Sequence, residues 1–253
     1  MKRTILKWFD LLGFPAAWRD EVAQAAELFD PSGEQTPMWH LLNALHRCDD
    51  TKKLYEEKGI DEDILMDTLA DIVTWAKNQY LVHQTVGLAE PGWLEGHLGG
   101  TLFCLGRLQF KMEKAIASNE ALAIREGDPV IEVHIPQGAP LDMEKVHASY
   151  LRAKPFFAKY FPEHGYTHFV CGSWLLDHHL KDFLKPTSNI LKFASEFEVF
   201  HWIEHNDAMR RLFDFNPNKG PENSFQKNVR TFVEGGGQLL EGYGILRWNG
   251  WDT

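Results

Sequence analysis

The stretch Pro129-Val130-Ile131-Glu132-Val133-His134-Ile135-Pro136-Gln137-Gly138-Ala139-Pro140-Leu141-Asp142 is the most informative part of the chain. Its apolar half predicts a short buried strand, its Pro and Gly residues predict a tight loop, and Asp142 predicts the start of a helix. A strand that opens through a glycine loop onto a helix N-terminus exposes backbone N–H groups at the positive end of the helix dipole. Such a junction is typical of phosphate sites, and a βα unit that holds no ligand has the same pattern.

Two titratable side chains lie on the predicted strand. Glu132 and His134 are two residues apart, so both project from the same face of that strand. A carboxylate beside an imidazole is a common acid/base pair, and it is equally a structural hydrogen-bonded pair. The sequence therefore places a candidate anion cradle next to a candidate acid/base pair.

Composition excludes several classes of protein. The 253 residues are 44% hydrophobic and include nine Trp and 17 Phe, which indicates a packed globular chain. A net charge of −10 without a Lys/Arg stripe argues against nucleic acid or an anionic membrane as partner. No apolar run approaches the ~18 residues of a membrane span, and residues 1–10 lack a signal-peptide core. Three widely spaced cysteines, Cys48, Cys104 and Cys171, predict reduced thiols in a cytoplasmic protein.

Hydrophobic periodicity divides the chain into a helical first part and a mixed second part. Pro37 predicts the start of one helix and Asp61 the cap of another. Strand-like runs follow Gly99-Gly100, and Pro155 predicts a kink or a break in the helix after Asp142. The apolar stripe of the helix after Asp61 is Ile64, Leu65, Leu69, Ile72, Val73 and Ala76. The predicted strands are 101–110, 121–125, 130–135, 168–176 and 239–248, and the helix after Asp142 is predicted over 143–161.

The chain resembles the GNAT-type acyltransferases in its C-terminal part, best over residues 90–215. As a whole it resembles bacterial proteins that join a helical N-terminal domain to a GNAT-like domain. The resemblance implies an α+β fold, with a helical domain over 1–96 followed over 97–253 by a GNAT-like mixed β-sheet flanked by helices. The residues that carry it are Leu105-Gly106-Arg107-Leu108-Gln109-Phe110, Val133-His134-Ile135-Pro136-Gln137-Gly138-Ala139-Pro140-Leu141, Ser173-Trp174-Leu175-Leu176 and Ser188-Asn189-Ile190.

The resemblance also implies an activity, which is acyl transfer from acetyl-CoA or another acyl-CoA to a small-molecule or peptide amine, without a metal. It implies that Glu132 or His134 is the base that removes a proton from the amine. It implies that the central strand and the loop after it hold the cofactor. The implied cofactor contacts are the backbone of Val133 and Ile135 for pantetheine, Gln137, Gly138 and Ala139 for pyrophosphate, and Ser188 and Asn189 for the cofactor arm.

The loop departs from the usual pattern of that family. GNAT enzymes carry Arg/Gln-x-x-Gly-x-Gly/Ala at this junction, and Gln137-Gly138-Ala139 is a fragment of it. Pro140 removes a backbone donor and Asp142 adds negative charge, and each opposes anion binding by roughly 1–2 kcal/mol. These departures favour an alternative, a non-catalytic ligand-binding or protein-interaction module that kept the sheet and lost the cofactor.

Three other patterns suggest different chemistry. His201-Trp202-Ile203-Glu204-His205 matches the zinc motif H-x-x-E-H, which requires a helix and a third ligand such as Glu222, Glu234 or Glu241. A zinc-dependent hydrolase is therefore a further alternative. Asp177-His178-His179 has the signature of DHH phosphoesterases and is more simply interpreted as a solvated helix start. Cys171 and Ser173 lack the Gly-x-Ser-x-Gly elbow of a nucleophile and are more simply core residues.

Overall fold

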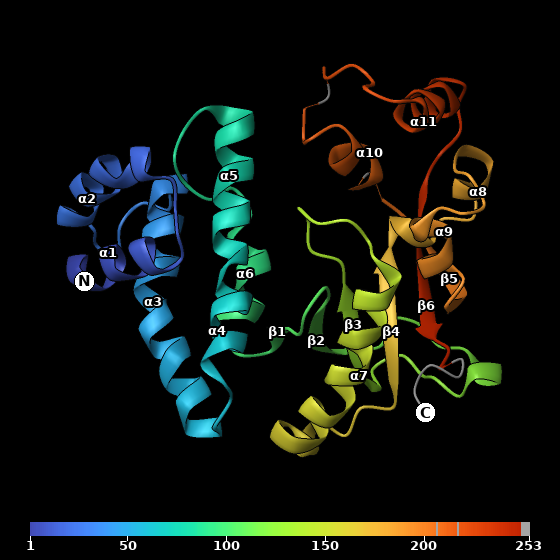
Figure 1. The fold of residues 1–253 in the computed structure, drawn as a ribbon, viewed down its shortest axis with the longest axis horizontal. Coiled ribbons are helices and arrows are strands. Elements are labelled where there is room, and N and C mark those ends of the chain that lie inside the picture. The colour runs from blue at the N-terminus through green and yellow to red at the C-terminus, as the bar shows by residue number, and fades with distance from the viewer. Residues whose placement is uncertain (206, 217, 249–253) are drawn as a thin grey trace. The chain divides into compact units, whose positions relative to one another are not determined.

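The computed structural model describes residues 1–205, 207–216 and 218–248. The chain forms two compact units, Met1–Leu105 and Gly106–Thr253, drawn from blue to green and from green to red in Figure 1. The first unit is helical, and the second is built on a sheet. The mixed α+β class predicted from the sequence is confirmed. The predicted division into a helical domain over 1–96 and a GNAT-like domain over 97–253 stays a prediction.

In the first unit, residues next to the helix ends determine where a helix begins and ends. Thr36 Oγ1 accepts a hydrogen bond from the Trp39 backbone N–H at 3.1 Å, so the helix predicted at Pro37 begins there. It ends at Gly59, whose left-handed φ of 69° suits glycine. The helices are α1 (Lys2–Leu11), α2 (Arg19–Glu27), α3 (Pro37–Lys58), α4 (Glu62–Leu69), α5 (Asp71–His83) and α6 (Pro91–Leu98), and β1 (Leu102–Cys104) follows them.

The apolar stripe predicted after Asp61 is confirmed as buried, but it lies on two helices, α4 and α5, which divide at Ala70. Asp71 begins α5 and is itself buried. Its carboxylate accepts hydrogen bonds from the indoles of Trp75 at 3.2 Å and Trp93 at 2.9 Å, and His97 Nε2 lies 3.1 Å away. A buried carboxylate needs such partners, so this cluster explains how Asp71 can be buried at the start of α5.

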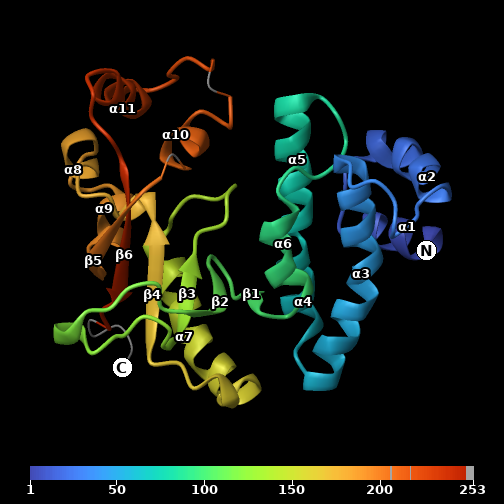
Figure 2. The ribbon, with the colours of Figure 1, turned by 180° about the vertical axis from the view of Figure 1, so that it is seen from behind.

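The second unit holds a mixed sheet in the order β2-β3-β4-β6-β5 (Figure 2). β3 pairs antiparallel with β2 and parallel with β4, so the strand predicted over 130–135 is central. β6 pairs antiparallel with both β4 and β5. The strands are β2 (Gln109–Lys114), β3 (Pro129–His134), β4 (His168–Ser173), β5 (Phe197–Glu204) and β6 (Leu240–Leu246).

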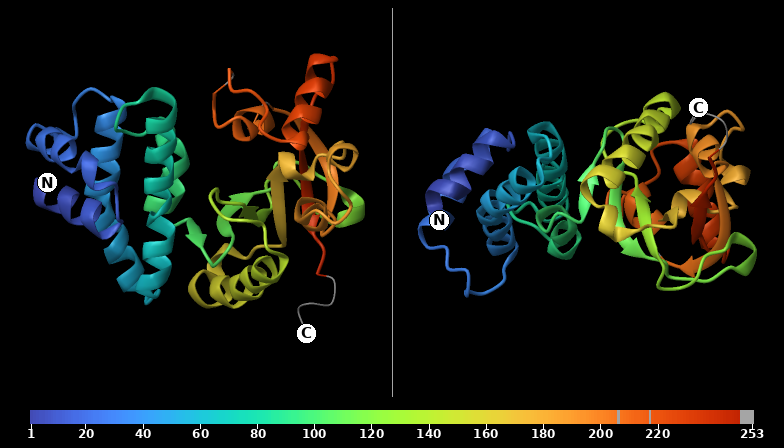
Figure 3. Two further views of the ribbon diagram at one scale, coloured as in Figure 1. Left: turned by 45° about the horizontal axis from the view of Figure 1, so that its top comes forward. Right: turned by 90° about the horizontal axis from the view of Figure 1, so that it is seen from below.

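Helix α7 (Met143–Tyr160) lies along one face of this sheet, as Figure 3 shows. The ring of Phe110 contacts Tyr150 of α7 and Phe169 of β4, at centroid distances of 6.3 and 6.0 Å. The helix begins where predicted, because the Asp142 side chain accepts a hydrogen bond from the Glu144 N–H at 3.0 Å. It continues through Pro155 without the predicted break. This crossover connects the parallel strands β3 and β4.

The other face of the sheet is apolar at one end. Val130, Val170, Tyr243 and Ile245 form a buried cluster there with the loop residues Ala115 and Ile124. A second cluster, built on Leu180, Ala208, Val229 and Leu239, joins the remaining helices to the strand ends. These helices are α8 (Leu180–Phe183), α9 (Asn189–Ala194), α10 (Asp207–Leu212) and α11 (Ser224–Glu234), and they lie toward the end of the sheet at which the arrow of β4 points in Figure 1.

Three predicted strands differ from the structure. The run 101–110 is interrupted between β1 and β2, where Gly106 takes a left-handed φ of 96°. The run 121–125 is a 3₁₀ turn, Glu120–Leu122, closed by an isolated bridge between Asn119 and Ile124. The strand predicted over 168–176 ends at Ser173 and continues as a 3₁₀ turn. Among the described residues, no helix combines the length and apolar character that crossing a bilayer requires.

Candidate active site

The central parallel pair of strands separates before either strand ends. The register between β3 and β4 stops at Glu132 and Val170, although β3 continues to His134 and β4 to Ser173. On its other side β3 stays paired with β2 up to His134. Along a strand the N–H and C=O groups of successive residues turn to opposite sides, so one of Val133 and His134 directs these groups toward β2 and the other toward the β4 side, beyond the last paired residues.

Glu132 and His134 meet at this separation. His134 Nε2 lies 3.4 Å from Glu132 Oε2, and the two side chains are 18% and 22% exposed, respectively. Burial opposes ionisation of Glu132, but the hydrogen bond and charge of His134, helped by Lys111 and a backbone hydrogen bond from Gly172, lower the pKa of Glu132 below its usual value. The predicted pair is thus a carboxylate held ionised against an imidazole.

A second carboxylate faces the same place. A Cβ built on Gly172 of β4 would lie 3.1 Å from Glu241 Oε1 and 3.2 Å from Glu132 Oε1, so both carboxylates flank this glycine. Burial raises the pKa of Glu241, and the nearby carboxylates of Asp207 and Glu132 add to the rise, whereas His205 and His134 oppose it. His205 Nδ1 lies 3.7 Å from Glu241 Oε2. The two glutamates therefore have pKa values shifted in opposite directions.

The loop after β3 is held by an arginine from the turn before β2. The guanidinium of Arg107 donates hydrogen bonds to the carbonyl oxygens of Pro136 at 3.0 Å, Ala139 at 2.8 Å and Pro140 at 2.9 Å. Its backbone N–H donates to Ser149 Oγ of α7 at 2.8 Å. Gln137, Gly138 and Ala139, the predicted pyrophosphate residues, lie in this exposed loop, and Gly138 takes a φ of 102°. Arg107 thus brings positive charge to the loop while it fixes the loop's carbonyl groups.

Asp142 occupies the N-terminal end of α7. Its carboxylate caps the first turn of the helix, next to the end of the loop that Arg107 holds. The cap satisfies one of the free N–H groups at the positive end of the helix dipole and places a negative charge there. The negative charge of Asp142, which the sequence showed as a departure from the family pattern, therefore lies at the helix end where a phosphate would bind.

The remaining predicted cofactor contacts have local structural roles. Ser188 Oγ accepts a hydrogen bond from the Ile190 N–H at 3.3 Å and so caps α9, while Asn189 is exposed at the first position of that helix. Contact of Ser188 and Asn189 with a cofactor stays a prediction. Val133 turns its side chain into the core, whereas Ile135 is half-buried just after the strand.

The zinc motif lacks the helix that it needs, and the Asp177 carboxylate of the second motif is engaged in hydrogen bonds. His201 and Glu204 lie on strand β5 and His205 follows it, so the helix that the zinc motif requires is absent from these described residues. Asp177 is buried, and its carboxylate accepts hydrogen bonds from the backbone N–H groups of His179 and Leu240. Asp177, His178 and His179 bring three possible metal-ligating atoms within 4.8 Å of one another, but these hydrogen bonds already engage both carboxylate oxygens of Asp177.

Cys171 and Ser173 do not form a nucleophile. Cys171 is fully buried, and burial together with Glu132 and Glu241 raises the pKa of its thiol well above the usual value. A thiol held protonated is a poor nucleophile. Ser173 Oγ accepts a hydrogen bond from the Leu175 N–H at 3.1 Å and begins the 3₁₀ turn after β4.

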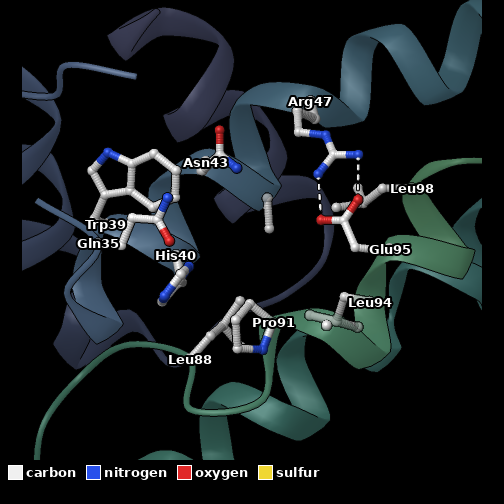
Figure 4. A pocket seen from close by; sticks show the side chains of 12 residues that line it. Gln35, Trp39, His40, Asn43, Arg47, Leu88, Pro91, Leu94, Glu95 and Leu98 are labelled. Atoms are coloured by element: carbon white, nitrogen blue, oxygen red, sulfur yellow. Dashed lines mark hydrogen bonds and ion pairs between the residues drawn. The ribbon is translucent and has the colours of Figure 1, made fainter. Parts of the chain in front are cut away.

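The first unit has a pocket of its own. It has a volume of about 280 Å³ and lies between α3 and α6. Figure 4 shows Trp39 and His40 at one end and Arg47 and Glu95 at the other, where two hydrogen bonds of 2.6 and 2.9 Å join the guanidinium to the carboxylate. None of the site residues predicted from the sequence lines this pocket.

Sequence reasoning did not identify Arg107 or Glu241 as parts of this site. Arg107 is 29 residues or more from the carbonyls that it binds, and Glu241 reaches Gly172 only because β6 pairs with β4. The sequence makes Glu241 a candidate only as a zinc ligand with His205, and the structure does place these two side chains next to each other.

Comparison with known proteins identifies two matching families. Residues 7–100 match the N-acyltransferase N-terminal domain, and residues 102–246, which are more than half of the chain, match the GNAT-like C-terminal domain. A search of curated proteins found no match.

Three similar solved structures share the fold. A tryptophan-to-alanine mutant of an acyltransferase in complex with octanoyl-CoA has a TM-score of 0.81 at 21% identity, over 95% of this chain and 86% of that one. An acyltransferase with decanoyl-CoA and teicoplanin has a TM-score of 0.79 at 21% identity, over 95% and 87%. An acyltransferase with CoA and 10C-teicoplanin has a TM-score of 0.74 at 24% identity, over 83% and 66%. By its two family matches, the chain belongs to the proteins that join an N-acyltransferase N-terminal domain to a GNAT-like C-terminal domain.

Proposed function

We propose that this protein transfers an acyl group from an acyl-CoA to an amine, and that Glu132 and His134 form its acid/base pair. The observation that carries the proposal is the separation of β3 from β4 beside this pair. A thioester bound along the free edge of β3 would bring its carbonyl close to the imidazole of His134. Family membership supports the same reaction class.

The chemistry requires a base, a polarised carbonyl and a bound thioester. His134 removes a proton from the ammonium group of the acceptor, and the ionised Glu132 beside it stabilises the imidazolium that forms. The free amine attacks the thioester carbon, whose oxygen is stabilised by backbone N–H groups at the strand edge. The C–S bond then breaks, and the CoA sulfur leaves with the electron pair and takes up a proton.

The loop that Arg107 holds would bind the phosphate end of the cofactor. Gln137, Gly138 and Ala139 are exposed there, and the guanidinium supplies the positive charge that their sequence lacks. The backbone of Val133 and Ile135 would meet the pantetheine arm. Ser188 and Asn189 are assigned to the same arm from the family resemblance alone.

The solved relatives suggest which donor and acceptor to test. Two of them hold octanoyl-CoA or decanoyl-CoA, and two hold the glycopeptide teicoplanin or 10C-teicoplanin. We therefore propose a medium-chain acyl-CoA as donor and a small-molecule or peptide amine as acceptor, with no metal in the reaction.

The direct test combines binding and turnover with the full chain. Calorimetric titration with acetyl-CoA and octanoyl-CoA should show binding of one or both. Release of CoA should then depend on an added amine, with benzylamine, a lysine-containing peptide and teicoplanin as probes. His134→Ala should lower kcat by ~100-fold or more with little change in acyl-CoA affinity. His83→Ala, at an exposed position in the first unit, is the matched control, and full turnover by His134→Ala would contradict the proposal.

One observation favours a second candidate, a non-catalytic module. The capping carboxylate of Asp142 repels an anion at the end of α7 where a phosphate-binding loop would be expected to have an open helix end. A protein that binds neither acetyl-CoA nor octanoyl-CoA in the titration would support this alternative over acyl transfer.

A further inference from the structure

We propose that Glu241 and His205 form a proton exit path that carries the proton taken by His134 to solvent. The inference rests on the proposed function and extends it by two residues on β6 and after β5. It starts from the arrangement of four titratable side chains, His134, Glu132, Glu241 and His205, around the end of the separated strands.

The reaction itself requires such a path. An ammonium acceptor loses two protons as it becomes an amide, and only one of them ends on the CoA thiol. The other must leave the site before the next turnover. A bound acyl-CoA covers the strand edge and reduces access of bulk water to His134, so a relay of side chains is useful there.

The contacts between the four side chains, and their increasing exposure to solvent, indicate that a proton moves from His134 toward His205. His134 contacts Glu132, both Glu132 and Glu241 flank Gly172, and Glu241 lies 3.7 Å from His205. The exposed fractions of the side chains rise along this order, from 18% at His134 through 22% and 25% to 51% at His205. His205 is thus the most exposed of the four side chains.

The glycine makes the two carboxylates neighbours. Any larger residue at position 172 would place its Cβ 3.1–3.2 Å from both carboxylate oxygens and 3.5 Å from the ring of Tyr243. Two ionised carboxylates that flank one glycine repel each other, so a proton is favourably held on one of them. Glu132 is held ionised by His134, so Glu241 is the carboxylate that takes up the proton.

Charged groups on neighbouring elements also shift the pKa values of Glu132 and Glu241. Lys111 acts on Glu132 from β2, and Asp207 at the start of α10 acts on Glu241. Cys171 on the same strand as Gly172 is buried and protonated. Glu241 and His205 act through Glu132, so in this scheme they are positioning residues with no contact to the substrate.

The test compares two nucleophiles with octanoyl-CoA as donor. Benzylamine is an ammonium ion at pH 7 and releases a net proton when it is acylated. Hydroxylamine is neutral at pH 7, and its acylation transfers one proton to the CoA thiol and releases none to solvent. Glu241→Gln and His205→Asn should each lower kcat with benzylamine by about tenfold or more, with little change in the octanoyl-CoA KM or in the hydroxylamine rate.

The matched control is Glu204→Gln. This residue is exposed, precedes His205 and pairs with Leu240, so it projects from the opposite face to Glu241. It should leave both rates unchanged. Equal loss with both nucleophiles in Glu241→Gln indicates a structural role, and no loss with either excludes the path; both results overturn the inference. If the wild-type chain acylates neither nucleophile, the proposed function itself is contradicted, and so is the proton exit path that rests on it.

Discussion

Arg107 donates a hydrogen bond from its guanidinium to the carbonyl oxygen of Ala139 at 2.8 Å, across 32 residues of sequence. Because the same guanidinium also binds Pro136 and Pro140, replacement by lysine removes the planar fork while it keeps the charge. Arg107→Lys should weaken octanoyl-CoA binding about tenfold in calorimetric titration, with a small change in Tm. Arg125→Lys, at an exposed position, should have no effect. Unchanged affinity in Arg107→Lys would exclude the loop as a cofactor contact.

At Asp142, which caps α7, substitution can separate the effect of the negative charge from the effect of the capping hydrogen bond. Asp142→Ser keeps an oxygen that accepts from the Glu144 N–H but removes the negative charge. It should raise octanoyl-CoA affinity several-fold at low salt and leave stability nearly unchanged. Asp142→Ala removes the cap as well and should cost about 1 kcal/mol of unfolding free energy. If Asp142→Ser binds no more tightly than the wild type, the phosphate does not lie near this helix end.

Gly172 provides a steric test of the carboxylate pair. Gly172→Ala places a methyl group against Glu132 and Glu241, which have to move apart. We expect a loss of about 1–2 kcal/mol in unfolding free energy and a fall in kcat of tenfold or more with an ammonium acceptor. Gly172→Ala combined with Glu241→Ala should recover most of the stability but not the turnover. Stability that stays low in the double variant would show that the clash is not with Glu241.

The opposite pKa shifts predict opposite effects of pH on stability. The pKa of Glu132 is lowered in the folded protein, so its contribution to stability is present above its unfolded pKa and is lost as pH falls through the folded value. Glu132→Gln should therefore be less stable than the wild type at pH 7, and the difference should shrink as the pH falls below 4.5, the ordinary pKa of a glutamate. Denaturant unfolding at several pH values measures this, and a difference that stays constant with pH would contradict it.

The contribution of Glu241 to stability should change with pH in the direction opposite to that of Glu132. Its folded pKa is raised, so its contribution is present below the unfolded pKa and is lost as pH rises through the folded value. Glu241→Gln should be more stable than the wild type at pH 7, with the gain disappearing in acid. The Glu204→Gln control should show no such trend. A destabilised Glu241→Gln protein at pH 7 would mean that the ionised carboxylate is well paired by His205.

Local signals predicted much of the fold. The strand at Val130, the helix cap at Asp142 and the helix start at Pro37 depend on residues within one turn or one strand, and all are confirmed. The predicted strand over 121–125 is wrong because so short an apolar run can also form a 3₁₀ turn, here closed by the bridge between Asn119 and Ile124. The zinc motif failed for a similar reason, since pairing with β6 makes residues 197–204 a strand.

By itself the sequence determined the helical first part, the central strand and the placement of Glu132 and His134 on one face, because strand alternation and helix capping act over a few residues. Only the tertiary structure decided which distant groups join them. Sheet pairing carries Glu241 to Gly172, and the turn before β2 carries Arg107 to the loop at Ala139. The physical reason is that side-chain electrostatics act through space, and strand order, which local patterns do not encode, sets which charges become neighbours.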